Sequence, residues 1–155
     1  LFFQNFDYKI LDVSTDQKQE TASAQLRLTT LDAQALARDF VSQSLQDEIL
    51  KAASGDKNTE ENENSLEQRY LRLHKLLKNN SYKTVDRNAS IQLINHGSPS
   101  NPNWEITHSY SLENDLVGGL ITYLSDPDLV PPDETLGVYL KTLQEMDVQQ
   151  MSNYL

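Results

Sequence analysis

Apolar and polar residues alternate in Phe6-Asp7-Tyr8-Lys9-Ile10 and again in Ala22-Ser23-Ala24-Gln25-Leu26-Arg27-Leu28-Thr29. Alternation with a period of two is typical of strands that bury one face. In the first stretch the pattern shifts by one residue at Leu11 and resumes at Val13. The polar residues 16–20 between the two stretches favour a turn. Together they predict an antiparallel hairpin with one buried face.

A second alternating region lies between residues 85 and 112. Its apolar positions are Val85, Ala89, Ile91 and Leu93, and then, with His108 among them, Trp104, Ile106, Tyr110 and Leu112. Residues 95–103 between the two runs are rich in Asn, Gly, Ser and Pro, which favour turns. The region therefore predicts a second hairpin, whose last strand continues to Leu112.

Helical patterns occupy residues 33 to about 80, between the two predicted hairpins. Asp32 is suited to cap a first helix, and Ser65 with Gln68 forms a capping-box start for a second. The apolar stripes of the two helices are Leu36, Phe40, Val41, Leu45 and Ile49, and Leu66, Tyr70, Leu73 and Leu77. Residues 56–64 hold no apolar side chain and predict a mobile surface loop.

A C-terminal helical extension is predicted at about 127–155, with Asp133 as a cap. Its stripe is Leu136, Tyr139, Leu140, Leu143 and Met146. With 155 residues the chain fits one compact domain, 1–155. Antiparallel hairpins with helices kept apart from them predict the α+β class, in the order β-β-α-α-β-β followed by the C-terminal helix.

The composition excludes several classes of function. The chain has no Cys, so a disulfide scaffold, a thiolate metal site and a Cys nucleophile are excluded. A net charge of −10 without a basic cluster argues against nucleic-acid binding. No apolar run approaches a membrane span. Because the chain does not begin with Met, we expect a processed or truncated product whose targeting segment is absent.

Catalytic and metal-binding motifs are also missing from the sequence. Gly118-Gly119 has neither the Lys-Ser/Thr nor the spacing of a nucleotide-binding loop. His74, His96 and His108 lack metal-ligand spacing, and residues 56–67 lack the ligand spacing of a calcium loop. No Gly-x-Ser-x-Gly elbow is present. We therefore predict no catalytic residue, no metal site and no cofactor.

His108 is the one histidine that the alternation places on an apolar strand face. Such a histidine can line a cavity, or it can be packed with its ring bonded to a backbone carbonyl, which is the commoner case. If the face is hollow, the candidates for the pocket wall are Trp104, His108, Tyr110 and Tyr8.

Residues 6–10 and 21–32, followed later by 89–94 and Trp104-Glu105-Ile106, resemble the strands of small lipoproteins from Gram-positive bacteria. Those proteins contain a nuclear-transport-factor-two-like (cystatin-like) domain. The resemblance covers roughly residues 5 to 120. It implies a curved antiparallel sheet wrapped on helices, a cone-shaped cavity, and a cell-surface or secreted location with a lipid anchor upstream. It carries over no catalytic residue, and the usual leading helices are not evident before Phe6.

Three functions follow as hypotheses. The first is a non-catalytic extracellular binding or assembly domain, whose partner is a small molecule or a cell-envelope protein and which touches the membrane only through its anchor. The alternative is a small cavity enzyme of the same fold, with His108 as general base and Tyr110 or an acidic residue as its partner. A third possibility is an interaction module whose C-terminal stripe docks on a second copy, which would make a homodimer.

Overall fold

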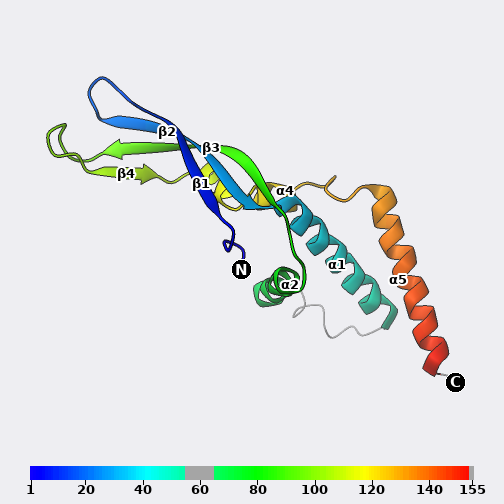
Figure 1. The fold of residues 1–155 in the computed structure, drawn as a ribbon. Helices are drawn as coiled ribbons and strands as arrows, with labels where there is room; N and C mark the ends of the chain where they lie inside the picture. Colours follow the sequence, from blue (N-terminus) through cyan, green and yellow to red (C-terminus); the bar gives the residue numbers. More distant parts are fainter. Residues whose placement is uncertain (55–64, 154–155) are drawn as a thin grey trace. The chain divides into compact units, whose positions relative to one another are not determined.

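The computed structural model describes residues 1–54 and 65–153 of the chain. The predicted loop at 56–64, with its acidic residues, lies outside the described residues. The elements are β1 (Asp7–Thr15), β2 (Thr21–Leu31), α1 (Ala33–Ser54), α2 (Leu66–Asn79), β3 (Thr84–Asn95), β4 (Trp104–Thr107), α3 (Tyr110–Leu116), α4 (Leu120–Leu124) and α5 (Pro132–Asn153). Figure 1 traces them from the blue β1 to the red α5.

The chain is α+β, as predicted, with one open antiparallel sheet in the order β1-β2-β3-β4 and a C-terminal helix. It divides into two compact units, which we describe separately. The sheet unit consists of Leu1–Gln34 and Tyr82–Tyr123, and the helical unit of Ala35–Ser81 and Leu124–Leu155.

The first predicted hairpin is present, including its irregularity. β1 pairs with β2 from Asp7 opposite Thr29 to Thr15 opposite Ala22, and the register shifts between Ile10 and Asp12. Leu11 is therefore the extra residue of a β-bulge, at the position where the sequence pattern shifts. The bulge keeps Ile10 and Val13 on the same face of the sheet even though they are three residues apart.

One face of the sheet is apolar and the other polar, because register and alternation agree across the strands. The apolar side of β2 is buried, and Leu28 is only 1% exposed. Leu26, Leu28 and Ala89 form the core of the sheet unit, with Phe6, Ile91 and Leu116 packed against them. The apolar side of β1 is different: Tyr8 is 61% exposed, and every residue of β1 is classed as exposed.

The prediction that the last strand reaches Leu112 was wrong. β4 ends at Thr107, and α3 begins at Tyr110. The Ser109 side chain caps α3 by accepting a hydrogen bond from the Leu112 backbone N–H at 3.1 Å. Glu113 lies in the first turn, where a carboxylate is favoured by the helix dipole. Residues 110–112 therefore form the start of a helix, even though apolar and polar residues continue to alternate through 108–112.

Arg87 is the polar residue that interrupts the apolar face of β3, and it connects the sheet to α3. Its Nη2 lies 3.0 Å from Oδ1 of Asp115, and both side chains are largely buried. Gly118 and Gly119, which follow α3, have φ values of 68° and 83°. Glycine is favoured at 119 by this backbone conformation, and a Cβ there would lie 2.4 Å from Nη1 of Arg87, so the guanidinium would have to shift.

The helical unit contains the two predicted helices of the insertion and α5. Ser65 caps α2 by accepting from the Gln68 backbone N–H at 3.3 Å, as the capping-box pattern predicts. Arg38 of α1 donates a hydrogen bond to Glu134 of α5, and this bond together with the charge of Glu134 raises the pKa of the Arg38 guanidinium. α5 starts with Pro132, so the prediction of Asp133 as its cap was wrong. Asp133 lies inside the helix, in the first turn together with Glu134.

Candidate ligand-binding groove

An open groove of about 970 Å³ lies in the helical unit, between α1, α2 and the last residue of α4. Its apolar walls are formed by Phe40, Val41, Leu66, Tyr70, Leu73 and Leu124. Ser44, Glu67, Arg69 and Arg72 supply the polar groups. A mostly apolar hollow with a few polar groups is the usual form of a small-molecule site, and its volume is at the upper end of the common range.

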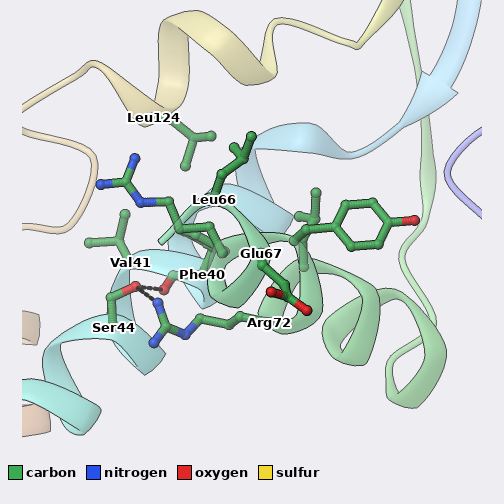
Figure 2. A pocket seen from close by; sticks show the side chains of 10 residues that line it. Phe40, Val41, Ser44, Leu66, Glu67, Arg72 and Leu124 are labelled. Carbon is green, nitrogen blue, oxygen red and sulfur yellow. Dashed lines mark hydrogen bonds between the residues drawn. The ribbon is translucent and has the colours of Figure 1, made fainter. Parts of the chain in front are cut away.

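Arg72 of α2 fixes one side of this groove because its side chain forms hydrogen bonds to residues of α1. Its Nη1 donates to Oγ of Ser44 at 2.9 Å, and its Nη2 lies 2.8 Å from Oδ2 of Asp47. The guanidinium carbon also lies 5.6 Å from the centre of the Phe40 ring, within cation–π distance. Figure 2 shows the Arg72 side chain reaching Ser44.

Ser44 is itself held, because its hydroxyl donates to the Phe40 carbonyl at 2.8 Å. The chain Arg72–Ser44–Phe40 thus joins two helices through groups that already have partners. Arg72 is therefore a structural residue, with one hydrogen bond from each terminal nitrogen to α1, and it contributes shape to the groove.

Arg69 differs from Arg72 in the surroundings of its guanidinium. It is exposed, and it makes no ion pair or side-chain hydrogen bond with the described residues. Glu67 lies two positions earlier on α2, and residues two apart on a helix do not face each other. Arg69 is thus the cation of the groove that remains available to an anionic group.

Two large side chains of the groove are exposed to solvent. Leu66 is 84% exposed and Tyr70 is 66% exposed. The Tyr70 ring stacks on the His74 ring with centres 6.4 Å apart. Both Leu66 and Tyr70 belong to the apolar stripe that the sequence shows on α2. That stripe lines the groove instead of entering the core, so it supplies apolar surface that a ligand can cover.

A second, smaller hollow of about 330 Å³ lies between α1, α2 and α5. Its lining is mostly polar and includes Asp39, Gln43, Asn80, Lys141 and Glu145. Mixed charges and amides of this kind are well solvated and offer little apolar surface. The larger groove is therefore the better candidate for a binding site.

The four residues predicted from the sequence to line a pocket belong to the sheet unit, and neither hollow contains them. Tyr8 lies on β1 opposite Leu28, and Trp104 lies half-buried on β4 opposite Asn95. β1 and β4 are the two edges of the sheet, about 14 Å apart at the usual strand spacing. These two side chains therefore come from opposite edges of the sheet.

His108 and Tyr110 lie beyond the end of β4. His108 is exposed in the connection to α3, and Tyr110 is the first residue of that helix and 63% exposed. The His108 ring makes no ion pair or hydrogen bond with any residue that the structure describes. A general base is normally oriented by such a partner. The geometry of residues 1–54 and 65–153 therefore offers no support for the alternative of an enzyme based on His108.

The described part of the chain lacks two further features. It holds no cluster of three or more His, Asp or Glu side chains able to bind a metal ion. None of its helices is long and apolar enough to cross a membrane.

Comparisons with models of known protein families, with curated proteins and with solved structures find no match for this chain.

Proposed function

We propose that this chain is a non-catalytic extracellular binding domain, and that the groove between α1 and α2 holds an amphiphilic small molecule with an apolar body and an anionic head. The observation that carries the proposal is the groove itself, with its apolar walls and two exposed apolar side chains on α2. Covering such surface is favourable by about 25 cal/mol for each Å² removed from water.

The choice of an anionic head follows from Arg69. Its guanidinium is exposed at the groove and has no partner among the described residues, whereas that of Arg72 bonds to Ser44 and Asp47. An exposed ion pair adds only about 0.2–1 kcal/mol, so the apolar body supplies most of the affinity and Arg69 selects the head group.

A fluorescent amphiphile tests the proposal directly. Anilinonaphthalene sulfonate has an apolar ring system and one anionic group, and it becomes bright when it leaves water. We expect saturable binding at one site. Tyr70→Ser removes an aromatic wall residue and is expected to weaken binding by roughly ten-fold.

The matched control is Tyr110→Ser, because Tyr110 and Tyr70 are almost equally exposed but only Tyr70 lines the groove. This control also tests the pocket predicted from the sequence. If Tyr110→Ser reduced binding and Tyr70→Ser did not, the groove would be excluded and the site would belong to the sheet unit.

The role of Arg69 is tested with a second probe. Arg69→Gln is expected to weaken binding of anilinonaphthalene sulfonate by about two- to five-fold and to reduce the effect of salt on that binding. Binding of the uncharged analogue phenylnaphthylamine is expected to stay unchanged. An equal loss for both probes would mean that Arg69 acts on the shape of the groove and does not select an anion.

The proposal extends to the family and the location. We infer a nuclear-transport-factor-two-like (cystatin-like) domain of a bacterial lipoprotein, attached to the cell surface by a lipid upstream of this chain. The antiparallel sheet, the bulge at Leu11 and the helices between β2 and β3 support the family, and the absence of Cys is compatible with the location. Release of the intact protein from cells by a lipase, and its loss when the lipid-bearing cysteine is replaced, would test the location.

A further inference from the structure

β1 is an edge strand that leaves one long side unpaired. The sheet ends at β1, so within the described residues no strand lies on the side opposite β2. An unpaired edge exposes a row of backbone N–H and C=O groups that can pair with another strand. β1 has nine residues, none of them proline, and four of its apolar side chains are exposed: Tyr8, Ile10, Leu11 and Val13.

The bulge at Leu11 determines how a strand can extend this sheet. Before the bulge the even-numbered Tyr8 and Ile10 face the apolar side, and after it the odd-numbered Val13 and Thr15 do. A strand with regular alternation pairs across the bulge with one residue opposite two, as β2 does. A second copy of β1, running antiparallel, carries the same extra residue and can instead pair residue for residue with its apolar side chains on the same side.

The apolar residues then fix which registers are possible between two copies. The apolar side chains stay on one side only if even-numbered residues before the bulge lie opposite odd-numbered residues after the bulge of the other copy. In an antiparallel pair the two residue numbers of every opposite pair add up to the same value, which defines the register. That value must therefore be odd. A sum of 21 pairs Tyr8 with Val13, Ile10 with Leu11 and Lys9 with Asp12. A sum of 23 also keeps the faces together, but it pairs Lys9 with Ser14 and matches no opposite charges.

Charge selects the first of these registers. With a sum of 21, Lys9 of each copy lies opposite Asp12 of the other, and the two-fold symmetry forms this pair twice. Opposite charges directly across two strands stabilise the pairing. The net charge of −10 on each copy opposes association, but at physiological salt it acts only within about 8 Å, which leaves the groups along the strand to decide.

We propose that β1 is an interface for a second copy of this chain, in which two β1 strands pair antiparallel with Lys9 opposite Asp12 and form one eight-stranded sheet. In the dimer the exposed apolar side chains of the two β1 strands would lie next to each other on one face of the sheet. This interface belongs to the sheet unit and goes beyond the proposed binding function, which uses the helical unit, so each proposal can fail without the other.

The first test measures self-association with exchanged charges. Sedimentation of the unaltered chain is expected to show a monomer–dimer equilibrium, and Lys9→Glu and Asp12→Lys are each expected to raise the dimer dissociation constant by roughly ten-fold or more. The double variant K9E/D12K re-creates both pairs and is expected to restore the dimer. A chain that stays monomeric at every concentration, or a double variant no better than the single ones, would overturn the proposal.

A second test does not depend on the charges, and it uses the absence of Cys in the chain. A mixture of Tyr8→Cys and Val13→Cys chains is expected to form a disulfide between the two variants under mild oxidation. Each variant alone is expected to crosslink poorly, because Tyr8 lies five residues, about 17 Å, from Tyr8 of the other copy. Equal crosslinking in all samples would exclude the pairing, and faster crosslinking of Ile10→Cys with Val13→Cys would exclude the register. Circular dichroism of every variant distinguishes loss of association from loss of fold.

Discussion

β1 and β2 are two strands of one hairpin with the same alternation, and they have opposite surroundings. Leu28 of β2 is almost completely buried, whereas Tyr8, which lies opposite it on β1, is mostly exposed. The difference comes from position, since β2 has a neighbour on each side and Leu116 and Phe6 packed over its core residues, and β1 is an edge. Alternation therefore predicts the face of the sheet on which a side chain lies. It does not predict whether other residues bury that side chain.

The largest expected effect is that of truncating the buried side of this pair. Leu28→Ala is expected to lower the free energy of unfolding by about 2–5 kcal/mol, because it removes a core side chain and leaves a cavity. Urea unfolding monitored by circular dichroism measures the loss. The control is Ile10→Ala at low protein concentration, where the loss is expected to be well below that of Leu28→Ala. Equal losses would show that β1 is buried in solution.

An intermediate effect is expected where α3 is attached beside the buried strand. Asp115→Asn leaves the Arg87 guanidinium without its charged partner and is expected to cost about 1–3 kcal/mol. Hydrogen exchange is expected to become faster at Leu28 and Ala89, because α3 is held less firmly over them. Replacing both members, Arg87→Leu with Asp115→Leu, is expected to restore most of the stability, since an apolar pair needs no charge compensation. If the double variant had a lower free energy of unfolding than Asp115→Asn, the ion pair would hold α3 in a way that apolar contact cannot replace.

The smallest effect is expected on the exposed side. Ile10→Thr keeps a β-branched side chain and is expected to change the free energy of unfolding of the monomer by less than about 0.5 kcal/mol. Because it removes apolar surface from the edge, it is also expected to weaken self-association measured by sedimentation. A large loss of monomer stability would contradict the exposure of this strand.

The parts of the fold that the sequence predicts are those with local causes. The shift at Leu11, the cap at Ser65 and the start of the C-terminal helix near Asp133 are all determined by residues a few positions apart. The end of β4 was mispredicted because two local signals compete there. The alternation runs on to Leu112, but Ser109 caps a helix, and Glu, Asn and Asp in residues 113–115 are poor strand formers.

The candidate groove could not have been predicted in the same way. Its wall residues on α2 form a visible stripe, and a stripe alone predicts contact with a core. One side of the groove is set by the contact of Arg72 with Ser44 and Asp47, which lie 28 and 25 positions away on another helix. No local sequence pattern encodes a hydrogen bond between residues so far apart in the chain. The local alternation instead predicted a pocket on the sheet face with Trp104 and His108.

The anchoring of Arg72 has a consequence for the kinetics of binding. Because its two hydrogen bonds and its contact with the Phe40 ring exist without a ligand, this side of the groove needs no rearrangement before a molecule enters. We expect the observed association rate to rise linearly with ligand concentration, in a single phase and without a plateau. Ser44→Ala, which removes one of the contacts, would then introduce a slow step that the native protein avoids.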